Sequence, residues 1–103
     1  NTYLLIWSFD YSTYEACPFY AGQYVLATMC TNGKISNTVF IGEDSGGGDP
    51  PYMGSVLATS NIADTFIEIT HTQEYTGEVE DDSEIIKSKC RFLISDNKIQ
   101  LDQ

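Results

Sequence analysis

The clearest alternation of apolar and polar positions lies in Gln23–Gly42, where two mostly apolar stretches flank Asn32-Gly33. Asn-Gly is the sequence most typical of a two-residue hairpin turn, because both turn positions need positive φ. With Thr31 set opposite Lys34, the other positions pair across the turn. One face then carries three apolar pairs, which are Cys30 with Ile35, Leu26 with Val39 and Tyr24 with Ile41. The segment therefore predicts a hairpin with one core face and one mixed face.

A second hairpin is predicted over Glu74–Ile94, around a turn at 81–84. This register places opposite charges together on one face and small or apolar residues together on the other. The charged pairs are Glu74 with Arg91 and Glu78 with Lys87, and the other pairs are Tyr75 with Cys90, Gly77 with Ser88 and Val79 with Ile86. Since the legs balance their own charges, only the tip from Glu80 to Glu84 is left without a folding role.

The remaining apolar runs predict further strands. Tyr3–Phe9 has no polar face over its first five positions, which is typical of a strand covered on both sides. Tyr14–Tyr20 contains Pro18 and predicts a short edge strand, because proline cannot donate to a ladder. Ala21-Gly22 is expected to turn the chain.

The C-terminal third continues the same pattern. Thr65–Glu80 predicts a long strand with Ile67, Ile69 and His71 on one face. Asp96-Asn97 predicts a last turn. That turn would pair Ile94 with Ile99 and Phe92 with Leu101.

Glu43–Ser55 contains three consecutive glycines and two consecutive prolines, which break helices and ladders. It predicts a loop of about a dozen residues, a length that is often functional. Its carboxylates, Glu43, Asp44 and Asp49, are candidate ligands for a hard cation such as calcium. They match no known calcium-loop pattern, so no metal is expected. Tyr52 and Met53 are instead expected to be contact residues for a partner, since aromatics and Met are favoured interface anchors.

Successive hairpins without any helical period predict one all-β domain over residues 1–103. The expected architecture is an antiparallel meander of seven or eight strands, closed or nearly closed into a small barrel. A two-layer β-sandwich is the alternative.

The chain has a net charge of -10, and it is unevenly distributed. Residues 1–42 contain Asp10 and Glu15 against Lys34, a net of -1, so residues 43–103 carry the other -9. This charge argues against binding to nucleic acid or to an anionic membrane, and no apolar run is long enough to span a membrane. The acidic tip, Glu80, Asp81, Asp82 and Glu84, is expected to attract a basic protein partner. The compartment is left open, with a lean toward secretion from the abundance of Ser, Thr, Asn, Gly and Tyr.

The cysteines and the histidine give little support for chemistry. Cys17, Cys30 and Cys90 include no CxxC pair, so a structural zinc site has no support. They are expected either as buried free thiols or with a Cys17–Cys30 bridge in a secreted protein. His71, on an apolar strand face, is expected to be a hydrogen-bonded core residue. No catalytic motif is present, so neither an enzyme nor a cofactor is predicted.

Aromatic residues crowd the first quarter of the chain. If the expected barrel were partly hollow, four of them would line a ligand cavity: Trp7, Tyr14, Tyr20 and Tyr24.

Taken together, the acidic charge and the absence of a catalytic motif favour a non-enzymatic binding protein, of the inhibitor or immunity type, that docks on a basic protein surface. The alternative is a β-barrel that carries an apolar or sugar-like small molecule. The oligomeric state is left open.

Overall fold

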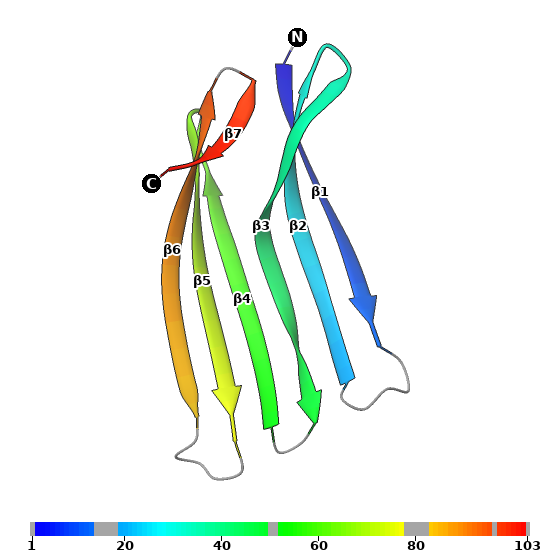
Figure 1. Cartoon of the computed structure of the whole chain (residues 1–103), viewed down its shortest axis with the longest axis vertical. Helices are drawn as coiled ribbons and strands as arrows, with labels where there is room; N and C mark the ends of the chain where they lie inside the picture. The colour runs from blue at the N-terminus through cyan, green and yellow to red at the C-terminus, as the bar shows by residue number, and fades with distance from the viewer. Residues whose placement is uncertain (1, 14–18, 50–51, 78–82, 96, 103) are drawn as a thin grey trace.

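The computed structural model describes residues 2–13, 19–49, 52–77, 83–95 and 97–102. These residues form a single seven-stranded antiparallel sheet in which each strand pairs with the next in the chain (Figure 1). The strands are β1 (Thr2–Ser12), β2 (Phe19–Thr31), β3 (Lys34–Asp49), β4 (Tyr52–Ile62), β5 (Phe66–Thr76), β6 (Glu84–Ser95) and β7 (Lys98–Leu101). The predicted all-β antiparallel fold is confirmed. Within the described residues, no helix is long and apolar enough to cross a membrane.

The sheet is open, because β1 and β7 are not paired with each other. Its radius of gyration of 16.6 Å exceeds the ~13 Å of a compact chain of this length. The extents of 53 × 30 × 16 Å are those of a long, thin body. The barrel expected from the sequence is therefore not observed.

The core lies at the upper end of the sheet as drawn in Figure 1. In the lower part of the sheet β3 pairs with β4, from Glu43 opposite Ala58 to Asp49 opposite Tyr52. In the upper part of the sheet β3 pairs only with β2. The separated upper ends enclose six buried apolar residues, Ala27, Met29, Ile41, Ile67, Ile69 and Ile99. Burying each of the Met and Ile side chains stabilises the fold by about 1.5–3 kcal/mol.

The upper half of β2 is buried on both faces. Ala27 and Met29 belong to the core, whereas Thr28 points to the other face, because successive strand residues alternate. Thr28 is only 2% exposed. Its hydroxyl accepts a 2.8 Å hydrogen bond from the Trp7 indole N–H and lies 2.9 Å from the Thr38 hydroxyl. These bonds satisfy a polar group that would be costly to bury alone.

Asn37 joins β3 to β7 across the open end of the sheet. Its Nδ2 donates to the Ile99 carbonyl at 2.6 Å, and its Oδ1 accepts from the Ile99 backbone N–H at 3.1 Å. Beside it, the Ser36 hydroxyl donates to the Asn97 carbonyl at 2.7 Å. The Asn37 amide thus replaces a missing neighbouring strand and holds Ile99 against the core.

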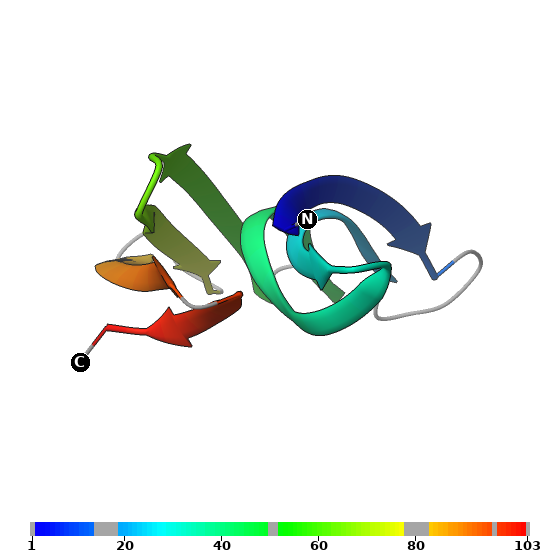
Figure 2. The same ribbon diagram turned by 90° about the horizontal axis from the view of Figure 1, so that it is seen from above.

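The predicted Asn32-Gly33 turn is confirmed, with φ values of 52° and 79° and with Cys30 opposite Ile35. Further from the turn, two bulges shift the register by one residue each. Leu26 therefore lies opposite Phe40, not Val39, and Tyr24 lies opposite Glu43, not Ile41. Bulges add residues to one strand and increase its twist. Figure 2 shows the resulting curl of upper β3.

The register predicted for Glu74–Ile94 is wrong by six residues. Arg91 lies opposite Glu68, not Glu74, and Tyr75 lies opposite Glu84, not Cys90. The Arg91 guanidinium lies 3.1 Å from the Glu68 carboxylate and 4.5 Å from the centre of the Phe66 ring. A shift by an even number keeps every side chain on its original face, so the alternation could not distinguish the two registers. Glu78 and Val79 lie outside the described residues.

The loop predicted for Glu43–Ser55 is wrong, because its residues continue β3 and begin β4. Gly46 pairs with Ser55, and Gly47 pairs with Gly54. Gly48 has a φ of 142°, which L side chains rarely adopt. A Cβ there would lie 2.3 Å from the Tyr52 carbonyl oxygen. Here glycine permits close approach of two paired strands and does not interrupt them.

Two N-terminal predictions are also corrected. Tyr3–Phe9 is not covered on both sides: it belongs to β1, an edge strand whose apolar side chains are mostly exposed. Ala21-Gly22 is not a turn, because both residues pair within β2 opposite β1. Tyr20 lies in β2, an interior strand, and residues 14–18 lie outside the described ranges. The last predicted turn is confirmed by the pairing of Ile94 with Ile99.

Candidate functional site

A groove runs along β3 and β4 on one face of the sheet. In its lower part Tyr20 pairs with Gly47, Gly47 with Gly54, and Gly54 with Tyr75. Directly paired residues point to the same face, so two tyrosines face each other across a floor of two glycines. Three strand spacings separate their backbones by about 14 Å.

The lower part of the groove has a volume of about 360 Å³. Its side-chain walls are the four tyrosines Tyr11, Tyr20, Tyr52 and Tyr75. An upper part of about 550 Å³ follows it, with Tyr24, Phe40, Glu43, Ala58, His71 and Cys90 among its lining residues. We call the two parts together the aromatic groove. Small residues in the middle strands and large ones on either side make it a trough.

Ring contacts order the β1–β3 wall of the groove. Tyr24 stacks on Phe9 and on Tyr11, with ring centres 5.3 and 5.7 Å apart, and the Phe40 ring meets it edge-on at 5.8 Å. Such pairs contribute about 0.5–1.5 kcal/mol each beyond their burial. The wall is therefore arranged before any ligand arrives.

The chemistry of this wall is that of neutral phenols beside a carboxylate. The hydrogen bond with Tyr11 raises the pKa of Tyr24 to about 12, together with desolvation and the nearby charge of Glu43. Tyr24 thus keeps its proton at physiological pH. Glu43 accepts a hydrogen bond from the Ser45 hydroxyl, which fixes one carboxylate oxygen at the groove floor.

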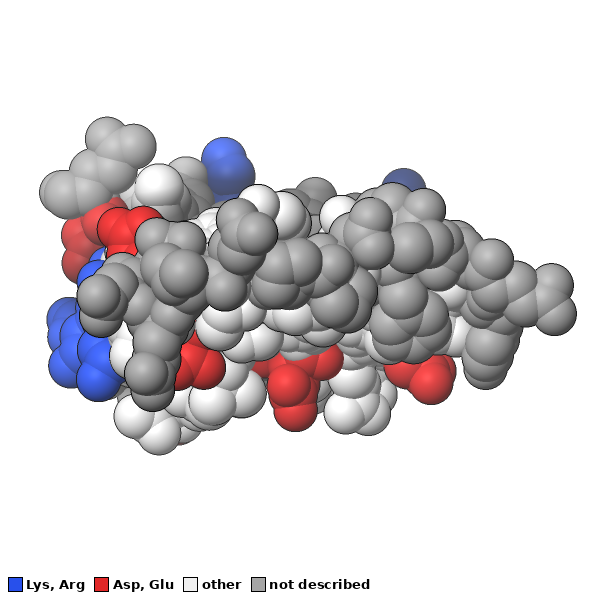
Figure 3. Space-filling model, turned by 90° about the horizontal axis from the view of Figure 1, so that it is seen from below, with Lys and Arg blue, Asp and Glu red and all other residues white. Residues whose placement is uncertain are grey.

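The two faces of the sheet differ in where the basic side chains of β6 lie. Glu84 pairs with Tyr75 and so shares the face of the aromatic groove with Glu43. On β6, Lys87, Lys89 and Arg91 alternate with the groove residues and so point to the opposite face. Figure 3 shows the largest group of basic atoms gathered on the β6 side of the molecule. Among the described residues that line the groove, Glu43 is the one carboxylate, and there is no Lys or Arg.

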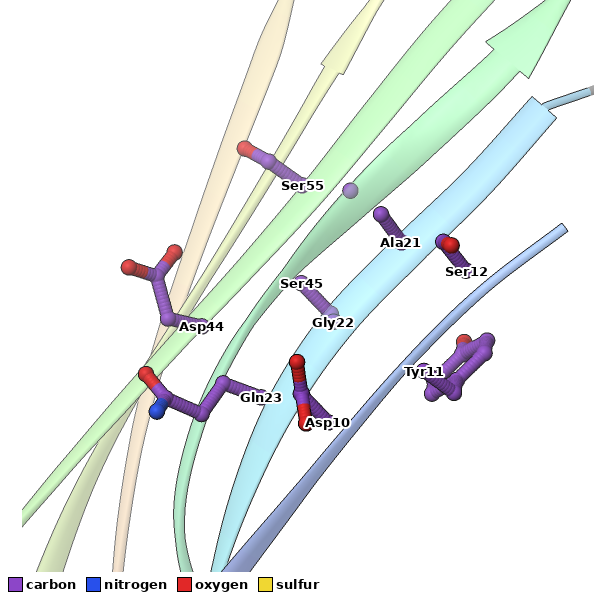
Figure 4. A pocket seen from close by; sticks show the side chains of 10 residues that line it. Asp10, Tyr11, Ser12, Ala21, Gly22, Gln23, Asp44, Ser45 and Ser55 are labelled. Carbon is purple, nitrogen blue, oxygen red and sulfur yellow. The ribbon is translucent and has the colours of Figure 1, made fainter. Parts of the chain in front are cut away.

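The opposite face carries a shallow polar hollow of about 910 Å³ (Figure 4). Asp10, Gln23 and Asp44 follow one another across β1, β2 and β3, so Gln23 separates the two carboxylates. Glu43 and Asp44 are consecutive in β3 and point to opposite faces. Among the described residues, no three His, Cys, Asp or Glu side chains are grouped to hold a metal ion. The side chain of Asp49 is outside what the structure describes.

The partner-contact residues expected from the sequence fall in different places. Tyr52 is 60% exposed and lines the lower groove. Met53 follows it in β4 and points to the other face. Glu84 begins β6 beside Tyr75. The remaining residues of the acidic tip, Glu80, Asp81 and Asp82, lie outside the described ranges.

The four aromatics expected to line a ligand cavity are also divided. Tyr20 and Tyr24 line the aromatic groove, on an open face and not inside a barrel. Trp7 shares that face, but its indole N–H is bonded to Thr28 near the core. Tyr14 lies outside the described residues. Sequence reasoning missed Tyr75 and the glycine floor, which only the pairing of β3 with β4 reveals.

His71 does not form a catalytic arrangement with its neighbours. It lies opposite Ser88, and both line the upper groove with Cys90. In the part of the chain that the structure describes, no hydrogen bond joins these three side chains. Cys30 is buried and Cys90 exposed, and both are free thiols. Cys17 lies outside the described residues.

Comparison of this chain with protein families, with characterised proteins and with solved structures found no match.

Proposed function

We propose that this protein is a non-enzymatic binding protein that holds a basic, extended segment of a protein partner in the aromatic groove. The observation that carries the proposal is the pairing of Tyr20 and Tyr75 across Gly47 and Gly54. A trough of about 14 Å between backbones is wide enough for one extended chain with its side chains, since strands lie ~4.8 Å apart and stacked sheets ~10 Å apart.

The chemistry of the groove supports a cationic ligand. Lys and Arg side chains are attracted to the faces of aromatic rings, and Glu43 and Glu84 offer carboxylates on the same face. The net charge of -10 would increase the association rate with a basic partner and disfavour acidic ones. We keep the acidic tip, Glu80, Asp81, Asp82 and Glu84, in this proposal as a second source of attraction. An inhibitor or immunity-type protein is one member of this class.

The proposal is tested with a fluorescently labelled ten-residue lysine peptide and its glutamate counterpart, measured by anisotropy at two salt concentrations. We expect the lysine peptide to bind, with an affinity that falls as the salt concentration rises, and the glutamate peptide not to bind. Tyr75→Ala should weaken binding by roughly tenfold, the usual effect of removing an aromatic anchor.

Asp44→Asn is the matched control, because it removes a charge from the opposite face and leaves the groove intact. Glu43→Gln removes a charge from the groove face for comparison. If Asp44→Asn weakens binding as much as Glu43→Gln does, and Tyr75→Ala has no effect, the peptide is bound by general charge and the groove proposal is wrong.

A second candidate is a small neutral ligand of the sugar-like kind. The tyrosine hydroxyls around the 360 Å³ part of the groove favour it, because such ligands need aromatic faces and a few oriented polar groups. A second layer over this face, as in the two-layer sandwich expected as the alternative fold, would enclose the aromatic groove. Binding of a neutral oligosaccharide that does not depend on salt, together with no binding of the lysine peptide, would favour this candidate.

A further inference from the structure

Strand β1 is a long, exposed and almost uncharged edge. It has eleven residues, pairs only with β2, and contains one charged residue, Asp10. Leu4 is half-buried. The other large apolar side chains of β1 are 42–54% exposed, namely Tyr3, Leu5, Ile6, Trp7, Phe9 and Tyr11. Edges of this kind are templates for pairing with another strand, and proteins usually protect them.

The opposite edge of the sheet, formed by β6 and β7, is protected in this way. The lower half of β6 presents Lys87, Lys89 and Arg91, and charged residues on an edge discourage pairing. Strand β7 has only four residues, and the Ile99 backbone groups are already bonded to Asn37. The contrast singles out β1 as the unprotected edge among the described strands.

We propose that a second copy of this chain pairs with β1 in antiparallel orientation, so that the two sheets join edge to edge. Full overlap of Thr2–Ser12 with itself places Trp7 opposite the partner's Trp7. It also sets Leu5 opposite the partner's Phe9 and Tyr3 opposite the partner's Tyr11. Asp10 then lies opposite the partner's Leu4, so the one acidic residue of each strand does not meet its own copy.

The surface area and the charge distribution of the chain both fit a second copy at this edge. The surface of 7136 Å² exceeds by about 1,300 Å² the ~5,800 Å² expected for a folded monomer of 11.5 kDa. A standard interface takes about 800 Å² from each partner, so this excess is sufficient. Self-association of an acidic protein is also easiest where its charge is lowest, and residues 1–42 carry only -1 of the total of -10.

The pairing has a consequence for the groove that does not depend on what the groove binds. Antiparallel strands in one sheet are related by a two-fold axis perpendicular to it, so both copies present the same face to the same side. The Tyr11 walls of the two grooves then flank a common seam. A β1–β1 contact also closes after two copies, which yields a dimer and not a fibre.

Sedimentation equilibrium of the whole chain over a range of concentrations tests the proposal. We expect a species of about twice 11.5 kDa. Leu5→Glu should raise the dimer dissociation constant by at least ~100-fold, because the two-fold interface contains each substitution twice. Leu57→Glu is the matched control: Leu5 and Leu57 are 48% and 50% exposed, but Leu57 lies in the interior strand β4.

Ser8→Glu provides a second edge variant in case Leu5→Glu does not fold, since Ser8 is an exposed polar residue of β1 opposite the partner's Ile6. Circular dichroism establishes folding of each variant. A wild-type protein that stays monomeric at hundreds of micromolar overturns the proposal. So does a dimer that both folded edge variants retain or that Leu57→Glu abolishes, because the contact would then lie elsewhere.

Discussion

The Asn37 bridge gives the sharpest test of how this open sheet is held together. Replacing Asn37 by alanine removes both hydrogen bonds to the backbone of Ile99. Ile99 is only 3% exposed and belongs to the core, so its freed N–H and carbonyl have little access to water. Asn37→Asp keeps the acceptor for the Ile99 N–H but loses the donor, and it sets a carboxylate against the Ile99 carbonyl.

The expected loss of stability follows from the two bonds. Each hydrogen bond contributes about 0.5–1.5 kcal/mol net, and a buried group left unsatisfied costs ~1–3 kcal/mol. For two backbone groups, Asn37→Ala should therefore lower the free energy of unfolding by about 2–6 kcal/mol. That is a large share of the roughly 5–15 kcal/mol available to a small domain. The midpoint of thermal unfolding should fall by about 4–8 °C per kcal/mol.

Urea unfolding followed by tryptophan fluorescence measures the change, with Trp7 as the single tryptophan. Asn61→Ala is the control, because Asn61 is an exposed asparagine of β4 and should change stability by less than ~0.5 kcal/mol. If Asn37→Ala is no more destabilising than Asn61→Ala, the bridge does not hold the upper end and the reasoning is refuted.

Two further predictions concern the groove. Gly48→Ala should destabilise the β3–β4 hairpin by ~1–3 kcal/mol, because the new Cβ would lie 2.3 Å from the Tyr52 carbonyl oxygen. Gly54→Ala should be less destabilising, because its Cβ makes only ordinary contact with Tyr75. Equal urea midpoints for the two variants would contradict this prediction. Tyr24 has a folded pKa of about 12 against 10, so its contribution to stability is complete below pH 10 and is lost as the pH rises through 12. In a titration at 295 nm we expect one late-ionising phenol that is missing in Tyr24→Phe, whereas ionisation of all wild-type phenols together near pH 10 would count against the Tyr11 hydrogen bond.

The features that the sequence predicted correctly are local. Asn32-Gly33 specifies a tight turn through a backbone conformation that few residues adopt, with φ of 52° at Asn32, and Asn97 adopts a similar φ of 68° directly before β7. The pairs nearest each turn follow at once, such as Cys30 with Ile35. Two residues per turn contain this information, so it can be read without tertiary structure.

The failures have a common cause in long-range pairing. The sequence placed Arg91 opposite Glu74, but a six-residue shift to Glu68 leaves the alternation unchanged and adds the Phe66 ring beneath the guanidinium. The sequence predicts a loop at the glycines of 46–48, because composition alone cannot distinguish a flexible turn from two closely paired strands. Closure of the sheet depends on how the bulges in β3 add to its twist.

The candidate site was predictable only in part for the same reason. The sequence predicts that Tyr20 and Tyr24 line a ligand cavity only in the alternative of a partly hollow barrel, because aromatics cluster in their segment. Tyr75 and Gly54 become their neighbours only through the pairing of β3 with β4 and of β4 with β5. A groove wall built from strands more than fifty residues apart leaves no local pattern.

The pairing of β3 with β4, from Glu43 opposite Ala58 to Asp49 opposite Tyr52, joins two wings of the sheet, β1–β3 and β4–β7. The core and the Asn37 bridge join the same wings at the upper end. Tyr20 belongs to the first wing and Tyr75 to the second. Any occupant that contacts both would therefore link the two wings, and its binding would increase the free energy of unfolding. Without an occupant, hydrogen exchange along the pairing of β3 with β4 should report the separation of the wings below the global unfolding free energy. A ligand that contacts both Tyr20 and Tyr75 would thus stabilise the pairing of β3 with β4 and, through it, the whole protein.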